Sequence, residues 1–105
     1  MAKIENPLIA VVGTFDTKTD ELQYLAEKIQ VAGGIPITID VSVLGETSFH
    51  PKFSKHDVAS SAGSTIDKIT NADDENIAMQ IMAKGAAKLI KELHIKKEIN
   101  GFIAL

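Results

Sequence analysis

The chain contains no cysteine and no arginine among its 105 residues. Without cysteine it can form no disulfide, perform no thiol chemistry and build no cysteine–zinc site. Without arginine, this segment has no guanidinium group that could hold a phosphate through two parallel hydrogen bonds. Any anion would therefore have to be held by backbone N–H groups, hydroxyl groups, lysine side chains or a metal ion.

Long apolar runs and excess positive charge are also absent. No stretch approaches the ~18 apolar residues that a membrane span requires. Residues 1–6 carry charge and lack the apolar segment of a secretory signal. The net charge of −3 argues against general nucleic-acid binding, which depends on clustered positive charge. We therefore expect a cytoplasmic, single-domain globular chain that binds neither membranes nor nucleic acids.

Apolar runs and helical spacings alternate along the chain. Residues 8–12 are apolar throughout, which is typical of a strand covered on both faces, and residues 35–41 are rich in β-branched side chains. Gly33 and Gly34 follow a helical pattern and predict its end in a left-handed C-cap. We predict strands over residues 8–12, 35–41 and 99–105, a helix capped by Thr17 or Thr19, and a second long helix over residues 73–93.

The stretch between residues 42 and 71 gives weaker signals. Ser54 and Asp57 have the spacing of a capping box and predict one short helical turn. Residues 60–65 are small and polar, which is typical of a connecting loop. Asp73, Asp74 and Glu75 suit the start of the second long helix, because acidic side chains complement the positive end of the helix dipole.

The order strand–helix–strand–helix–strand predicts a parallel sheet with right-handed crossovers. In strand order 3-2-1 both long helices would share one face, whereas in order 2-1-3 they take opposite faces. We favour 2-1-3, because the apolar first strand needs cover on both faces. The expected fold is α/β, a Rossmann-like or flavodoxin-like three-layer parallel sheet that is truncated after the third strand.

The third strand would leave an unfinished sheet edge, which proteins usually pair or cover. We therefore interpret residues 1–105 as one subdomain of a longer, two-domain protein, or as a subunit of a homo-oligomer whose partner completes the sheet. In order 2-1-3, the loop after the first strand and whatever follows Leu105 are neighbours. Ligands of open parallel sheets bind at this switch point.

A polar hexapeptide follows the first strand. Gly13 would let the backbone approach a phosphate at the start of the helix, and Thr14, Thr17 and Lys18 would supply hydroxyl and ammonium donors. Asp16 would hold a magnesium ion that neutralises the phosphates. Alternatively, the hexapeptide only turns the chain, with Asp16 or Thr17 as the N-cap and Lys18 in solvent. The candidate residues are Gly13, Thr14, Phe15, Asp16, Thr17 and Lys18.

Other candidate residues are few. Asp40 ends the second strand, where an acidic side chain can accept from ribose hydroxyls or, alternatively, start a turn. His50 and His56 would need further ligands to hold a metal, and loop histidines are more often solvated. No nucleophile has an adjacent base, and no carboxylate pair is fixed by helical spacing. We therefore do not expect this segment itself to be an enzyme.

The chain also resembles the amino-terminal domain of the tomato mosaic virus resistance protein, that is, of the Tm-one-like ATP-binding family. The likeness is carried by residues 13–18, by Ile39-Asp40-Val41, by Asp74 and the helix after it, and by residues 101–105. The resemblance implies a Rossmann-like nucleotide-binding part followed by a larger domain. It also implies binding of ATP, and it adds Asp74 to the candidate nucleotide-binding residues.

The combined expectation is an ATP-binding domain of a two-domain cytoplasmic protein, with a binding or regulatory role and Mg²⁺ as a second cofactor. Two alternatives stay open. The chain would be an assembly module that associates through its unfinished sheet edge, or a fragment of an enzyme whose catalytic residues lie downstream. Titration of ATP separates the first expectation from the assembly module.

Overall fold

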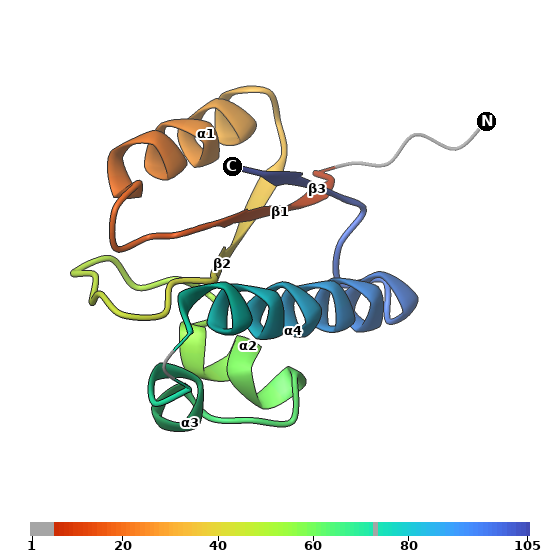
Figure 1. Cartoon of the computed structure of the whole chain (residues 1–105). Coiled ribbons are helices and arrows are strands. Elements are labelled where there is room, and N and C mark those ends of the chain that lie inside the picture. Colours follow the sequence, from red (N-terminus) through yellow and green to blue (C-terminus); the bar gives the residue numbers. More distant parts are fainter. Residues whose placement is uncertain (1–5, 73) are drawn as a thin grey trace.

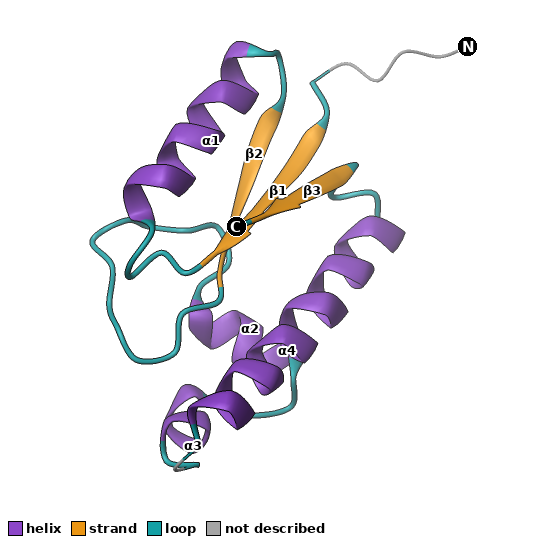
Figure 2. Ribbon diagram, turned by 45° about the horizontal axis from the view of Figure 1, so that its top comes forward, coloured by secondary structure: helices purple, strands orange, loops and turns teal. Residues whose placement is uncertain are grey.

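The computed structural model describes residues 6–72 and 74–105. It has an α/β fold, with three strands that form one parallel sheet in the order β2-β1-β3 (Figure 1, Figure 2). The predicted fold class and the favoured strand order are confirmed, and each strand ends within two residues of its predicted bounds. The elements are β1 (Leu8–Gly13), α1 (Thr19–Val31), β2 (Ile35–Asp40), α2 (Lys55–Ser61), α3 (Ile66–Thr70), α4 (Glu75–Ile95) and β3 (Gly101–Ala104).

Helices cover β1 on both faces of the sheet, as its continuous apolar run requires. α1 lies on one face, and α4 lies on the other together with α2 and α3 (Figure 1). Val11 packs with Phe15 and Leu22 in the cluster under α1, whereas Ala10 and Val12 belong to the larger cluster on the α4 side. Successive residues of a strand point to opposite faces, so this division follows directly from the sequence of β1. The switch point of the sheet lies between β1 and β3.

The first long helix ends as predicted. Gly33 has a φ of 97°, the left-handed conformation that glycine adopts at little cost after a helix. The N–H of Gly33 donates to the carbonyl of Gln30, and the N–H of Gly34 donates to the carbonyl of Ile29. These two bonds satisfy carbonyl groups that the helix end would otherwise leave without a partner.

The start of α1 differs from the prediction. Lys18 is the N-cap residue, and no side chain of the described part caps the helix. Thr17 is not available as a cap, because its hydroxyl pairs with the hydroxyl of Thr14 at 3.1 Å. The hydroxyl of Thr19 donates to the carbonyl of Phe15. The predicted caps are therefore wrong, because local hydroxyl bonds compete with capping.

The region between β2 and α4 is more helical than its sequence indicates. α2 begins at the predicted capping box, in which Ser54 accepts from the N–H of Asp57 and the Asp57 carboxylate accepts from the N–H of Ser54. Ser60 and Ser61 continue this helix, so the predicted loop over residues 60–65 shrinks to residues 62–65. The five-residue helix α3 was not predicted; it is too short to show a helical period.

α4 is the longest helix, with Asp74 as its N-cap residue accepting from the N–H groups of Asn76 and Ile77. Asp73, predicted at the same helix start, lies outside the described residues. α4 packs closely against α2, since a Cβ atom built on Gly85 would lie 2.3 Å from the carbonyl oxygen of Val58. Neither α4 nor any other helix within residues 6–72 and 74–105 is long and apolar enough to cross a membrane.

Candidate functional site

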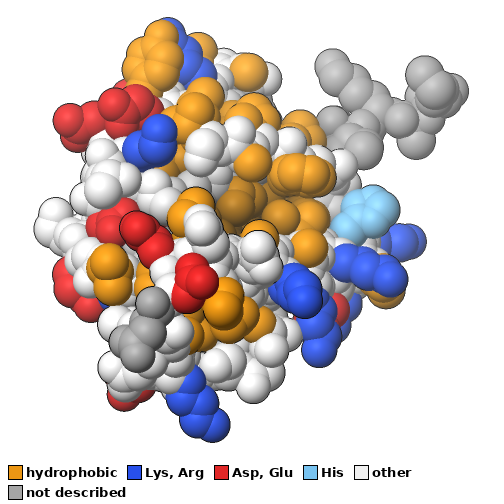
Figure 3. Space-filling model, in the orientation of Figure 1, with side chains coloured by type: hydrophobic (Ala, Val, Ile, Leu, Met, Phe, Trp, Pro, Cys, Tyr) orange, Lys and Arg blue, Asp and Glu red, His pale blue; other side chains and the backbone are white. Residues whose placement is uncertain are grey.

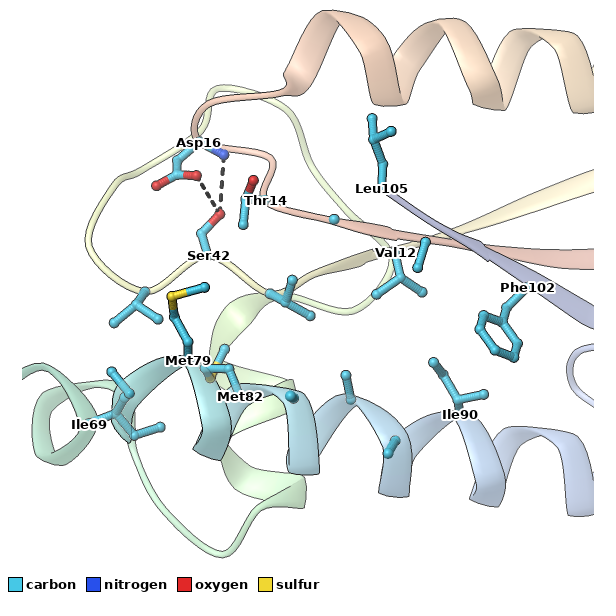
Figure 4. Close-up of a pocket in the computed structure, with 18 of the residues that line it drawn as sticks. Val12, Thr14, Asp16, Ser42, Ile69, Met79, Met82, Ile90, Phe102 and Leu105 are labelled. Atoms are coloured by element: carbon cyan, nitrogen blue, oxygen red, sulfur yellow. Dashed lines mark hydrogen bonds between the residues drawn. The ribbon is translucent and has the colours of Figure 1, made fainter. Parts of the chain in front are cut away.

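A cavity of about 1250 Å³ lies between α4 and the sheet. It extends from the carboxyl ends of the strands along the length of α4, and its walls are largely apolar. Met79, Met82 and Ile90 line it from α4, and Val12 and Phe102 line it from the strands (Figure 4). Figure 3 shows hydrophobic side chains gathered in this hollow, with acidic side chains on one side and lysines on the other. Such a cavity is the default place to look for a ligand.

Polar residues gather at the end of the cavity where the strands end. The loop after β1, the residue Ser42 after β2 and the start of α4 all contribute to this end. Five of the eight predicted nucleotide-site residues line the cavity, namely Gly13, Thr14, Asp16, Thr17 and Asp74. The other three, Phe15, Lys18 and Asp40, do not line it. The chain thus folds most of the predicted set around one space at the switch point.

Asp40 is buried, with 3% of its surface exposed, and its carboxylate holds two loops together. Its Oδ1 atom accepts from the N–H of Phe15 at 3.2 Å, from the N–H of Ser42 at 2.9 Å and from the Ser42 hydroxyl at 2.5 Å. Three donors therefore converge on one carboxylate oxygen, and the groups come from the loop after β1 and the end of β2. Contact between this oxygen and a ribose would require these bonds to be given up.

Asp16 also bonds to the neighbouring loop. Its Oδ1 atom accepts from the Ser42 hydroxyl at 3.0 Å, and its Oδ2 atom accepts from the N–H of Gly45 at 3.1 Å (Figure 4). A Cβ atom built on Gly45 would lie 2.5 Å from Oδ2, so only glycine permits this approach. Ser42 is 1% exposed, and its hydroxyl lies between the two carboxylates, which share its single proton. Sequence reasoning missed this serine, because its only signal was its place directly after a strand.

Phe15 anchors the hexapeptide to the protein core. It is fully buried, and its ring stacks on that of Phe49 with centroids 5.1 Å apart and an angle of 8° between the planes. This contact joins the loop after β1 to the loop after β2, as the two aspartates do. Phe15 therefore positions the loop, whereas Lys18 is exposed at the start of α1.

The backbone N–H groups of the hexapeptide are largely used within the protein. Those of Phe15 and Asp16 donate to Asp40 and Ser42, and those of Thr17 and Lys18 donate to the carbonyl of Thr14 at 3.2 and 2.9 Å. A phosphate cradle made of these four amides is therefore not open in this conformation. The groups left to meet an anion are the Thr14 and Thr17 hydroxyls, the Lys18 ammonium group and the N-terminal end of α1.

A buried lysine fixes the far side of the same loop. Lys55 is 5% exposed, and its Nζ atom donates to the carbonyl of Gly45 at 2.9 Å and to Oε1 of Glu46 at 2.8 Å. The hydrogen bond from Lys55 and its positive charge lower the pKa of Glu46 below the ordinary value. Gly45 is thus held from two sides, by Asp16 at its N–H and by Lys55 at its carbonyl.

Within residues 6–72 and 74–105, no three histidine, aspartate or glutamate side chains lie close enough together to hold a metal ion. His50, His56 and Asp16 are among these residues, so none of them belongs to such a group. A metal ion bound near Asp16 would therefore need most of its ligands from elsewhere, such as phosphate oxygens and water. Mg²⁺ is commonly bound in this way, through one or two carboxylates and the phosphates of a substrate.

Residues 7–105 match the family model described as the uncharacterised protein family UPF0261, N-terminal domain. The chain belongs to the UPF0261 family. A UPF0261 protein of Brucella suis biovar 1 is 47% identical over 104 residues, which are 99% of this chain and 25% of the relative. A UPF0261 protein of Clostridium tetani is 37% identical over 100 residues, which are 95% of this chain and again 25% of the relative.

The chain therefore spans about a quarter of the length of these UPF0261 relatives, as expected for one domain of a larger protein. A UPF0261 protein of Rhizobium meliloti is 33% identical over 87 residues, or 78% of this chain. No solved structure matches the chain. The relatives carry no assigned function, so the family alone gives this domain no activity.

The resemblance to the Tm-one-like ATP-binding family is corrected by these matches, which point to UPF0261. The misleading feature was the hexapeptide at residues 13–18. A glycine and hydroxyl residues between a buried strand and a helix suit any strand-to-helix junction of an α/β fold. The ATP binding implied by that resemblance loses this support, and any case for a nucleotide must be made from the site itself.

Proposed function

We propose that this UPF0261 domain binds a nucleotide, with ATP and Mg²⁺ as the pair to test first, in a binding or regulatory role in the cytoplasm. The observation that carries the proposal is the position of the cavity. Its polar end lies at the switch point between β1 and β3, where open parallel sheets bind their ligands. Its apolar length runs from there along α4.

The two parts of the cavity suit the two parts of a nucleotide. Met79, Met82 and Ile69 offer apolar surface on which a flat base can pack. Thr14 and Thr17, whose hydroxyls lie 3.1 Å apart, offer donors to phosphate oxygens at the strand ends. The N-terminal end of α1 carries no side-chain cap, which leaves its positive dipole end for an anion.

The charge around the polar end favours a phosphate that arrives with a cation. Asp16, Asp74 and Glu75 all line this end of the cavity. Three carboxylates would repel a bare triphosphate, whereas a magnesium complex carries less negative charge. In the proposed complex Asp16 contributes one metal ligand, and the phosphates contribute others. Asp16 can do so while its bond to Gly45 is kept, because Oδ1 and Oδ2 are separate ligand atoms.

Titration calorimetry with MgATP tests the proposal on the full-length protein and on the 105-residue chain. The double variant Thr14→Val and Thr17→Val removes both hydroxyls and keeps the side-chain shape. A hydrogen bond to a charged group is worth about 1.5 kcal/mol or more, so the affinity should fall at least about tenfold. Ser48→Ala is the matched control, because this exposed hydroxyl lies outside the cavity.

Two results would contradict the proposal. One is the failure of both the full-length protein and the 105-residue chain to bind MgATP. The other is equal affinity of the double variant and the Ser48→Ala control. Binding by the full-length protein alone would keep the site and show that this domain supplies only part of it.

A further inference from the structure

β3 is an apolar strand that the described residues leave uncovered on both faces. Phe102 is 58% exposed and Ile103 is 42% exposed. Phe102 pairs with Ala10 and Ile103 pairs with Val11, which point to opposite faces of the sheet. The neighbouring strand β1 is buried on both faces at the same level. The helices therefore cover β1 but not β3, although the sequence of β3 is as apolar as that of β1.

The hollows beside β3 match this lack of cover. On the α4 face, Phe102 and Ile90 face each other across the cavity without filling it (Figure 4). On the α1 face, a smaller and more open hollow is lined by Tyr24, Leu25 and Leu105, with Asp20 and Glu21 also in its wall. An apolar strand with open space on both faces normally lies inside a sheet, not at its edge.

The edge of β3 is also unpaired along its outer side. The N–H of Leu105 donates to the carbonyl of Val12, so the N–H of Ile103 points toward β1 by the alternation of the strand. The amides of Phe102 and Ala104 then point away from β1, to the open edge. Within the described residues β1 is the neighbour of β3 in the sheet, and no strand lies on its other side.

The UPF0261 relatives have a long stretch of chain outside the matched domain. The matched part is an N-terminal domain and makes up 25% of the relatives, so three quarters of their length lies outside it. A second copy is a weaker candidate. Two copies related by a two-fold axis would pair four-residue strands only, and each copy would bring the same uncovered faces. The continuing polypeptide is available in the same molecule at high effective concentration.

The handedness of crossovers fixes the arrangement. The crossover from β2 to β3 passes α4 over one face, in the direction from β2 across β1. A right-handed crossover that continues in the same direction places its helix on the same face as α4. We propose that the segment following Leu105 in the full-length UPF0261 protein packs a helix against Phe102 beside α4, and then adds a fourth parallel strand along β3. The helix covers the part of the cavity at Phe102 and Ile90, and its N-terminal end lies at the polar end.

Hydrogen exchange in the full-length protein tests this docking without any ligand, so its result does not depend on whether the protein binds a nucleotide. The amide of Ile103 is the internal reference, because it points toward β1 in either case. With a fourth strand in place, the amides of Phe102 and Ala104 should exchange within about tenfold of that reference. Exchange about a hundredfold faster than the reference would overturn the proposal. Protection that disappears on dilution would overturn it too, because it would indicate a second copy.

A charge substitution gives a second, independent readout in the full-length protein. Phe102→Lys places an ammonium group under the proposed helix, whereas Val31→Lys changes an 82% exposed residue of α1. If the helix docks as proposed, Phe102→Lys increases the rate of proteolytic cleavage after residue 105 several-fold and Val31→Lys does not. Equal rates for both variants and the parent protein would refute the docking. If Phe102→Lys does not fold, the exchange measurement still decides.

Discussion

Replacing Asp40 by alanine is the sharpest test of how the strand ends are held. The carboxylate is buried, and its Oδ1 atom accepts from the N–H of Phe15, the N–H of Ser42 and the hydroxyl of Ser42. Alanine leaves these donors without their acceptor. If Asp40 holds the loops together, the substitution lowers the free energy of unfolding strongly. If it serves mainly as a ribose ligand, the substitution changes affinity and leaves stability nearly intact.

The size of the effect follows from the three hydrogen bonds. A bond to a charged group contributes about 1.5–3 kcal/mol. At the lower figure the three bonds together predict a loss of roughly 4.5 kcal/mol for Asp40→Ala. Asp40→Asn keeps an acceptor at Oδ1 and loses the charge, so we expect about half that loss. A free energy of unfolding that falls in the order wild type, Asp40→Asn, Asp40→Ala is the specific signature of the bonds at Oδ1.

Urea unfolding followed by circular dichroism measures these losses. Asp67→Ala is the control, because this exposed aspartate lies in the first turn of α3 and should change stability by no more than about 0.5 kcal/mol. A loss below about 1 kcal/mol for Asp40→Ala would refute the reasoning, since it would be smaller than a single bond to a buried carboxylate.

Three further predictions concern the packing and the charges that support the site. Gly85→Ala should lower the free energy of unfolding by about 1–2 kcal/mol, because the new methyl group would meet the Val58 carbonyl. This clash outweighs the gain in helix propensity. A rise in the urea midpoint would show that α2 and α4 do not approach so closely. Ser54→Ala should cost about 1 kcal/mol by removing the capping box of α2, and unchanged protection of the first amides of α2 in hydrogen exchange would count against it. Lys55→Met should raise the pKa of Glu46 toward its ordinary value in an NMR titration. Because the pKa of Glu46 is lowered in the folded state, the ion pair stabilises the fold above the unfolded pKa, and this stabilisation is lost as the pH falls through the folded pKa. An identical Glu46 titration in the wild type and in Lys55→Met would contradict the assignment of the lowered pKa to Lys55.

The fold could be predicted because its main elements have local causes. The apolar run of β1 required cover on both faces, and this requirement selected the strand order 2-1-3. Gly33 could be predicted as a helix end because glycine readily adopts the left-handed conformation found there. α3 could not be predicted, since five residues show less than two turns of a helical period.

The candidate site could be predicted in position but not in detail. The hexapeptide reaches the switch point because it follows a central strand, which is a matter of topology. The bond from Phe15 to Asp40 and the bonds from Ser42 and Gly45 to Asp16 join residues 25 to 29 positions apart, and nothing in the local sequence indicates such partners. Ser42 was overlooked for the same reason. Only the two bonds from Ser42 to Asp40 are local. A carboxylate near a strand end has the same local sequence signal whether it binds a ligand or a neighbouring loop.

These bonds change how the strand ends can recognise an anion. The amides of Phe15, Asp16, Thr17 and Lys18 already have acceptors within the protein. A phosphate at this place would therefore meet two hydroxyls, the Lys18 ammonium group and one helix end, which is a sparse set of donors for a triphosphate. The proposed helix after Leu105 would begin at the same polar end and would bring further free amides. MgATP should accordingly bind the full-length protein more tightly than the 105-residue chain. Equal affinities would mean that the hydroxyls and α1 suffice, and that the following segment completes the sheet without completing the site.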